Sequence, residues 1–125
     1  MKISKYFSKE ELECKCGCGR SNTNSQLLNY LDRIRILYGK PIIITSGCRC
    51  STHNKAVGGT QFSDHLILDF QQCVAVDITC NSSKDRWDLI KYAMIVGIDR
   101  IGIHKDFLHL GLSERNTKDT IWIYK

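Results

Sequence analysis

Three residues of the sequence combine metal-ligand chemistry with positions that are otherwise apolar. Asp77 lies in the apolar run 74–78, and His109 lies in the apolar run 107–110. A buried carboxylate without a partner costs several kcal/mol, so such residues need a compensating group. His65, at the end of a long glycine-bearing loop, offers a third donor. Two imidazoles and one carboxylate, with a fourth position left to water, are typical of a catalytic zinc site. Taken singly, an Asp–Lys pair and a core His bonded to a backbone carbonyl explain the same positions.

The cysteines indicate a second kind of site. Seven are present, an odd number that cannot all pair within one chain. Five of them fall in two loop segments that could bring their sulfurs together: Cys14, Cys16, Cys18, Cys48 and Cys50. These five predict either a structural zinc held by four thiolates or disulfides formed after release, and the sequence leaves both open. Cys73 and Cys80 flank the run that contains Asp77 and either pair with each other or are buried thiols.

The elements that must position these residues follow from periodicity and from helix start and stop signals. Residues 8–11 form a capping box, and residues 27–38 repeat apolar side chains at helical spacing before a Gly-Lys-Pro stop. A second helix is capped at residues 82–85 and carries Trp87, Ile90 and Met94 on one face. Residues 46–63 are expected to form a long loop. The predicted strands are 41–45, buried on both faces, and 74–79, 100–103, 107–110 and 121–124.

Helices with short strands and hairpin-length links predict an α+β fold with a mainly antiparallel central sheet and helices packed on one face. The length of 125 residues predicts one domain over 1–125, and the ordinary globular composition (42% hydrophobic, 25% charged) excludes a disordered chain. No apolar run is long enough for a membrane span or a signal peptide, so we expect synthesis in the cytosol. The net charge of +5 favours an anionic partner, but the basic residues are scattered and do not single out nucleic acid.

Several separated motifs resemble the zinc D-alanyl-D-alanine carboxypeptidase family, which also holds phage L-alanyl-D-glutamate endopeptidases and is related to the hedgehog fold. The resemblance rests on residues 46–59, 63–66, 75–78 and 107–110, in the order that the family has them. Residues 7–12, followed by the cysteine-rich residues 14–19, are similar to a small single-domain branch found in phages and prophages. The match runs over about residues 7–112.

The resemblance implies that His65, Asp77 and His109 hold zinc. It also implies that Arg49 points at a substrate carbonyl or carboxylate, and that Ser63 belongs to the substrate-binding segment. The family pattern, Ser-x-His-x-x-Gly-x-Ala-x-Asp, places its two ligands closer together than the twelve positions between His65 and Asp77. Loop extension is thermodynamically cheap, so a longer bulge can return to the same strand. Asp69, in that insertion, is the rival ligand; the Ala-x-Asp-Ile context favours Asp77.

Asp106 and His104 are the candidates for proton transfer. Asp106 stands three residues before His109, like the acidic residue of the endopeptidase and dipeptidase branches, and predicts the general base. Because residues three apart on a strand face opposite ways, this role requires Asp106 to lie in the turn before the strand. His104 matches a histidine of the carboxypeptidase branch and predicts an electrostatic helper. His53 is interpreted as structural.

The implied function is a zinc metallopeptidase that hydrolyses peptidoglycan stem peptides, of the D-Ala-D-Ala carboxypeptidase or L-Ala-D-Glu endopeptidase type. Its expected cofactor is a catalytic Zn²⁺, with a second structural Zn²⁺ if the cysteines hold one. We expect an endolysin-like monomer that has peptidoglycan as its partner, binds no nucleic acid, has no membrane span, and acts at the cell wall after release. The main alternative is a non-catalytic zinc protein of the wall or virion. A zinc-ribbon-like nucleic-acid module would explain the cysteines and the charge but gives His65, Asp77 and His109 no role.

Overall fold

The computed structural model describes all of residues 1–125, which contain four helices and five strands joined by loops. The helices are α1 (Lys9–Leu12), α2 (Ser25–Tyr38), α3 (Ser51–Ala56) and α4 (Ser83–Val96). The strands are β1 (Ile44–Ser46), β2 (Ala75–Thr79), β3 (Arg100–Ile103), β4 (Phe107–Gly111) and β5 (Thr120–Ile123). The α+β class that the sequence predicts is confirmed.

The five strands form one sheet in the order β1-β2-β4-β3-β5. Its neighbouring pairs are antiparallel except for β3 and β5, which run parallel and make the sheet mixed. The parallel pair arises because the chain crosses back after β4 and enters β5 beside the start of β3. There the Thr120 N–H donates to the Asp99 carbonyl at 3.0 Å. The mainly antiparallel sheet of the sequence prediction is therefore observed, with one parallel edge.

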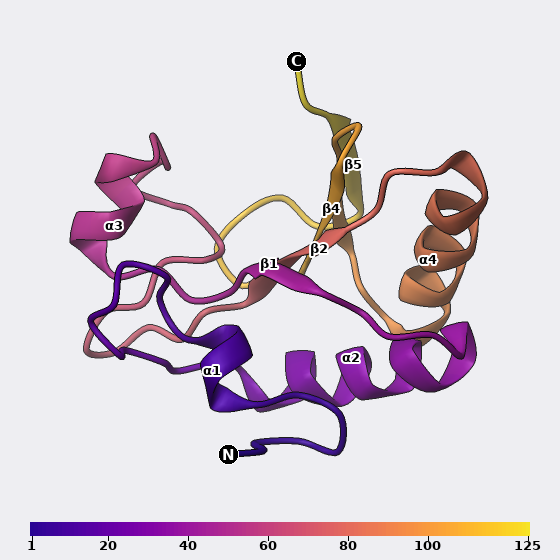
Figure 1. Cartoon of the computed structure of the whole chain (residues 1–125). Helices are drawn as coiled ribbons and strands as arrows, with labels where there is room; N and C mark the ends of the chain where they lie inside the picture. Colours follow the sequence, from indigo (N-terminus) through magenta and orange to yellow (C-terminus); the bar gives the residue numbers. More distant parts are fainter.

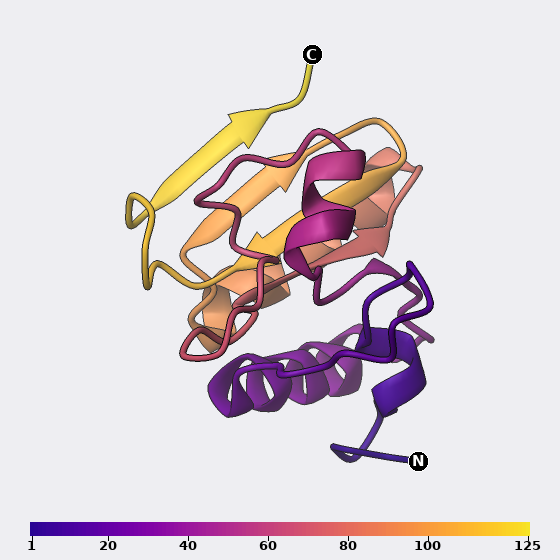
Figure 2. The ribbon, with the colours of Figure 1, turned by 90° about the vertical axis from the view of Figure 1, so that its left-hand side faces the viewer.

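The two long helices pack together over one face of the sheet and share its apolar core. α2 buries Leu27, Leu31 and Ile34, the residues whose spacing predicts this helix, and packs against α4. α2 ends at Gly39, which adopts the left-handed conformation at φ 73°. The short α3 lies on the other side of the sheet from α4 (Figures 1 and 2). No helix combines the length and the apolar character that crossing a bilayer needs.

Two details of the predicted core are wrong. The β1 strand covers Ile44–Ser46 rather than 41–45, and the alternation of buried Ile42 and Ile44 with Ile43, which is 62% exposed, shows that only one face meets the core. In α4 the buried residues are Leu89, Ala93 and Val96.

Trp87 and Met94, which the sequence groups with Ile90 on one face, are 69% and 53% exposed. The helix is therefore rotated relative to the face that its largest apolar residues suggest. The expected loop 46–63 also contains the short helix α3, which the sequence analysis missed. The Sγ of Cys50 caps α3 by accepting the His53 N–H at 3.4 Å, and a cysteine is not among the usual helix caps.

One row of residues crosses all five strands on the sheet face opposite the long helices. Strand register places Ser46 beside Asp77, Asp77 beside His109, His109 beside Gly102, and Gly102 beside Trp122. The residues that flank this row along β2 and β4 point into the apolar core. Because side chains alternate along a strand, the same packing that buries the core also presents this row to α3 and its loop.

Candidate metal centre and active site

The structure brings His65, Asp77 and His109 together. All three are buried, and their donor atoms lie within 4.8 Å of one another. His65 Nε2 and His109 Nδ1 are each 3.2 Å from the same oxygen, Asp77 Oδ1. Asp77 and His109 are register partners on β2 and β4, whereas His65 arrives from the loop that follows α3. Sheet pairing thus sets two of the three positions, and the loop supplies the third.

The second nitrogen of each imidazole is already used. His65 Nδ1 is 2.8 Å from the Gly47 carbonyl oxygen, and His109 Nε2 is 3.2 Å from Asp64 Oδ2. Both partners can only accept a hydrogen bond, so each neutral imidazole commits its one N–H there and turns a bare nitrogen toward Asp77. Two bare nitrogens and a carboxylate oxygen all offer electron pairs, so no hydrogen bond joins them. A bound cation would accept all three electron pairs. Two imidazole nitrogens and a carboxylate, oriented by outer hydrogen bonds, fit Zn²⁺.

The electrostatics of the three residues agree with this donor set. Burial lowers the pKa of His65 and keeps the ring neutral. Burial acts to raise the pKa of Asp77, but without a metal ion a proton on the His109 or His65 nitrogen that faces Asp77 makes a hydrogen bond to the carboxylate, which outweighs burial and holds the pKa well below its usual range. For His109, burial acts to lower the pKa, yet hydrogen bonds to Asp64 and Asp77 raise it. A proton on His109 therefore competes with a metal ion, as is general for metal-binding imidazoles.

Asp64 precedes His65 in the sequence, is buried beside the cluster, and has a role that the sequence does not predict. Its carboxylate is 2% exposed, and it accepts hydrogen bonds from Arg100 Nε at 2.9 Å and from Asn116 Nδ2 at 2.7 Å. Burial acts to raise the pKa of Asp64, but the hydrogen bonds from His109, Asn116 and Arg100 lower it to about 2. Asp64 is therefore a fixed anion that orients His109. Its position next to His65 was the only signal in the sequence, because its three partners are 36, 45 and 52 positions away.

Arg49 lies beside the donor cluster, as the sequence predicts. Its Nε donates to Ser46 Oγ and its Nη1 donates to Asn54 Oδ1, each at 3.3 Å, while Nη2 is 3.8 Å from Asp77 Oδ2. Asn54 is a buried residue of α3. Gly59 is required at this point because a Cβ there would lie 2.1 Å from Asn54 Oδ1. The loop and α3 together hold the guanidinium in place.

A cavity of about 380 Å³ opens over the cluster. Arg49 and Ser63 line it together with two aromatic residues, Trp122 in β5 and Tyr124 just after it, to which the sequence assigns a strand but no role at the site. Ser63 Oγ accepts the backbone N–H of His65 at 3.2 Å. The aromatic wall depends on Gly102, since a Cβ at that position would lie 2.7 Å from both Trp122 and Tyr124. The glycine between the two β-branched residues of β3 was the available signal.

His104 and Asp106 lie in the turn between β3 and β4, and neither lines this cavity. The His104 ring stacks on Phe107 at 4.5 Å, and its Nδ1 accepts the Asp106 N–H at 3.1 Å. The Asp106 side chain is 65% exposed. Because Asp106 precedes β4 rather than lying on it, strand alternation does not direct it away from His109. The catalytic roles of both residues stay predictions.

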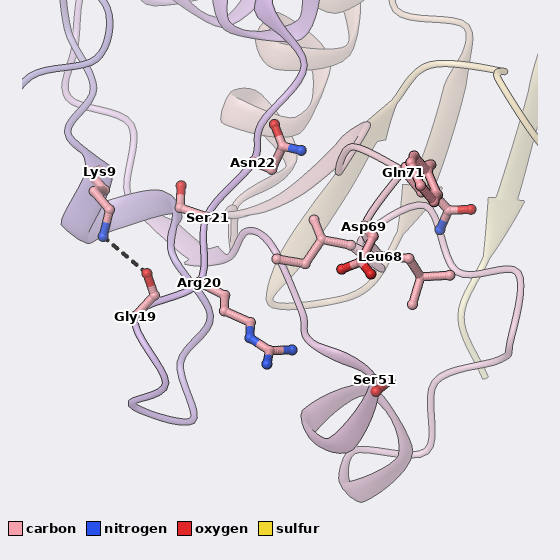
Figure 3. A pocket seen from close by; sticks show the side chains of 11 residues that line it. Lys9, Gly19, Arg20, Ser21, Asn22, Ser51, Leu68, Asp69 and Gln71 are labelled. Carbon is pink, nitrogen blue, oxygen red and sulfur yellow. Dashed lines mark hydrogen bonds between the residues drawn. The ribbon is translucent and has the colours of Figure 1, made fainter.

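The largest hollow of the surface lies elsewhere. It measures about 850 Å³ and separates residues 19–22 from the insertion at 67–71, with Lys9 Nζ donating to the Gly19 carbonyl at 3.0 Å on one wall (Figure 3). Asp69, the rival ligand, lines this hollow rather than the cavity at His65. The hollow contains none of the three donors, so the chemistry belongs to the smaller cavity.

The cysteines divide differently from the sequence prediction. Cys14, Cys16, Cys18 and Cys50 come together, but Cys48 does not join them. Cys48 instead packs with Cys73 and Ile67 in a small separate cluster, and its Sγ accepts the Asn22 N–H at 3.4 Å.

Of the five sulfurs that the sequence could bring together, four are neighbours and Cys48 is the one left out, because it packs in a different cluster from Cys50. Cys80 belongs to the main core, apart from Cys73, so these two residues are buried thiols rather than a pair. His53 contributes a backbone N–H to Cys50, in line with the structural role expected for it.

Comparison with known proteins gives one family. Residues 5–111 match a family model described as Peptidase M15. The matched range contains the three donors, Arg49 and Asp106, whereas β5 with Trp122, and Tyr124 after it, lie beyond it. The comparison with curated proteins finds no match.

Proposed function

The chain belongs to the peptidase M15 family, and on that premise we propose that it is a zinc-dependent peptidase that cleaves the stem peptides of bacterial peptidoglycan. The observation that carries the proposal is the orientation of His65 and His109. Gly47 and Asp64 take the outer nitrogen of each ring, so both inner nitrogens face Asp77. Three protein donors leave a fourth position for substrate or water, which a catalytic zinc site requires.

His65, Asp77 and His109 would hold a Zn²⁺ ion, which would supply Lewis acidity toward a peptide carbonyl bound in the cavity. Arg49, held by Ser46 and Asn54, binds the carbonyl oxygen or a terminal carboxylate of the substrate. Its fixed fork of N–H donors suits either group and costs little reorganisation. The Ser63 oxygen already accepts the His65 N–H, and its own hydroxyl proton remains free to donate to the substrate backbone.

Asp106 is the proposed general base. Its carboxylate takes a proton from the attacking water and returns the proton to the nitrogen of the leaving amine. The position of Asp106 in the turn before β4 supports this role, because the residues on either side of it approach the cavity wall: the rings of His104 and Phe107 are 6.1 Å and 5.2 Å from the Tyr124 ring. His104, whose Nδ1 accepts the Asp106 N–H, keeps its Nε2–H to offset the negative charge that develops on the carbonyl oxygen.

The size and charge of the protein support a short peptide from the cell wall as substrate. The cavity volume falls within the range of about 300–1,000 Å³ that small-ligand sites occupy. The net charge of +5 attracts the protein to a polyanionic wall. The scissile bond is either the D-Ala-D-Ala bond or the L-Ala-D-Glu bond. We place the activity at the wall after release of the protein from the cytosol, in the manner of an endolysin.

Digestion of purified peptidoglycan tests the proposal. Zinc-loaded protein is expected to release peptides whose masses identify the bond cut, and a chelator is expected to stop the release. Added Zn²⁺ should restore it. If the zinc-loaded protein releases nothing yet sediments with the wall, the proposal fails and the non-catalytic wall-binding alternative takes its place.

A further inference from the structure

The four cysteines outside the active site come from two distant segments of the chain. Cys14, Cys16 and Cys18 lie in the turns after α1, and Cys50 caps the N-terminus of α3. Their sulfur atoms lie within 4.8 Å of one another. The active-site cavity contains none of these residues. The cluster is therefore a second group of ligating side chains that the peptidase reaction does not use.

The distances between the sulfurs match those around a metal ion. Cys14 Sγ is 3.5 Å from Cys16 Sγ and 3.7 Å from Cys50 Sγ, and Cys16 Sγ is 3.7 Å from Cys50 Sγ. A disulfide needs about 2.05 Å. Four sulfurs placed tetrahedrally at about 2.3 Å from one zinc ion are about 3.8 Å from each other, since the edge of a tetrahedron is about 1.63 times that bond length. The three Sγ–Sγ distances agree with a tetrahedral zinc site and not with a disulfide.

The backbone around the cluster supports thiolates. The Cys50 N–H donates to Cys14 Sγ, and the His53 N–H donates to Cys50 Sγ, each at 3.4 Å. Such outer hydrogen bonds orient metal ligands and stabilise their charge. Gly17 and Gly19 adopt φ values of 91° and 74°, a conformation that other residues rarely take. These two glycines let the chain turn tightly enough for Cys16 and Cys18 to face the same point.

We propose that Cys14, Cys16, Cys18 and Cys50 bind a structural Zn²⁺ as four thiolates. Four protein ligands leave no open position, so this ion takes no part in the reaction. It joins the N-terminal segment to α3, and neither α1 (Lys9–Leu12) nor α3 (Ser51–Ala56) is long enough to be a stable helix alone. Binding releases the thiol protons to solvent and needs no oxidant.

The ion also has a consequence for the active site. α3 carries Asn54, whose Oδ1 accepts from Arg49 Nη1, and Asn54 Nδ2 in turn donates to the Thr60 carbonyl at 2.8 Å. An anchored N-terminus of α3 therefore fixes the side chain that positions the Arg49 guanidinium. This link rests on the proposed function, whereas the metal site itself does not.

Metal counting on the full chain, purified with a reductant, tests the site. Wild-type protein is expected to hold two zinc ions per chain, and Cys16→Ala and Cys18→Ala are expected to hold one. Cys80→Ala is the matched control, because Cys80 is a free cysteine in the main core, and it should keep both ions. His109→Ala should lose the other ion and keep the sulfur-bound one.

Cobalt substitution identifies the ligands independently of activity. The wild type and His109→Ala are expected to show the intense thiolate-to-cobalt charge-transfer absorption, and Cys16→Ala is expected to lose it. In the native wild type, iodoacetamide should modify the four cysteines only after a chelator has been added.

Three results would overturn the proposal: one zinc per chain that disappears in His109→Ala, modification of these cysteines in the zinc-loaded wild type, or an intact mass that shows disulfides among them. A wild type with one zinc that persists in His109→Ala and disappears in Cys16→Ala would instead uphold the structural site and remove the catalytic zinc. The two proposals can therefore fail separately.

Discussion

The two donor clusters of this protein differ in what holds their side chains. Asp77 and His109 are opposite each other on paired strands of the sheet, and the ring orientations of the two histidines are fixed by Gly47 and Asp64. The cysteine cluster has no strand in it: three of its members lie in glycine-containing turns and the fourth caps a helix of six residues. One cluster is supported by the core and the other by loops.

This difference indicates what a zinc ion would do at each cluster. A site on paired strands keeps its geometry without metal, so the free energy of metal binding remains available for the reaction. A site on loops exists only when the ion closes it, so its binding energy becomes folding energy for those loops. The histidine cluster is thus suited to catalysis, and the cysteine cluster is suited to stabilising structure.

Loss of one imidazole tests the first half of the comparison and has the largest expected effect. His109→Ala or His65→Ala should reduce peptide release by at least about 10³-fold, because the Lewis acid is lost together with its ligand. The metal-free variants should unfold within a few degrees of the metal-free wild type, since the sheet does not depend on the ion. Zinc content, peptide release and thermal unfolding are the measurements.

His53→Ala is the matched control, because His53 lies close by in α3 but contributes only its backbone N–H to the cysteine cluster. It should keep full activity. Full activity in His109→Ala would show that the histidine cluster is not catalytic.

Substitution of Asp106, in the turn before β4, is expected to have the next largest effect on turnover. Asp106→Ala should keep its zinc but lose turnover by about 10²–10⁴-fold, the usual contribution of a general base. Single-turnover rates with wall-derived peptide, together with zinc content, measure it. His104→Ala should cost less, because it removes only an electrostatic contribution. If Asp106→Ala turns over normally and His104→Ala does not, the base is His104.

Asp64 allows a smaller and more selective change. In Asp64→Asn the amide oxygen still accepts the His109 N–H, but the anion that orients the ring is gone. Loss of such an outer partner costs about 10–100-fold in metal affinity. Titration with a competing chelator should show this weakening at the histidine site alone, and the cysteine site of the same molecule is the internal control. Equal weakening at both sites would mean that the two clusters share one support.

Much of the histidine cluster could be predicted from the sequence, because burial makes a carboxylate or imidazole in an apolar strand conspicuous. Asp77 and His109 were identified in this way, and the α2 helix was identified from the spacing of Leu27, Leu31 and Ile34. Periodicity reports which face of an element is buried. Periodicity does not report which distant residues meet across the fold.

This limit explains why Cys48, Asp64 and the buried face of α4 were not predicted correctly. Cys48 and Cys50 are two positions apart, yet Cys50 joins the metal-type cluster and Cys48 packs against Cys73, because the direction of a loop is set by its hydrogen bonds. Asp64 was overlooked because its role depends on His109, 45 positions away. In α4, Ala93 is buried and Trp87 is exposed, because the size of an apolar side chain does not determine which face of the helix meets α2 and the sheet.

The packing of α2 against α4 involves none of the residues of either cluster, and one exposed ion pair reports on that packing alone. Lys40 Nζ, just after α2, is 2.9 Å from Asp85 Oδ1 in α4. Hydrogen bonds from Lys40, Tyr38 and Ser82 lower the pKa of Asp85 to about 2 from an ordinary value of 3.8. The unfolded chain therefore binds the proton first as the pH falls. The stabilisation from Asp85 is complete above about pH 4 and is lost as the pH approaches about 2.

Asp85→Asn should accordingly lower the Tm at pH 7 by about 1–4 °C, the size expected for an exposed pair in a domain of this length. The difference from wild type should shrink between about pH 4 and 2. Asp88→Asn removes the same charge from the same helix, where Asp88 pairs with Lys84 one turn away, and it is the matched control at pH 7 for the loss of a helix carboxylate. Neither variant should alter zinc content or peptide release. If Asp85→Asn weakened zinc binding at the histidine cluster, that cluster would depend on helix packing as well as on strand pairing, and the contrast with the cysteine cluster would be one of degree.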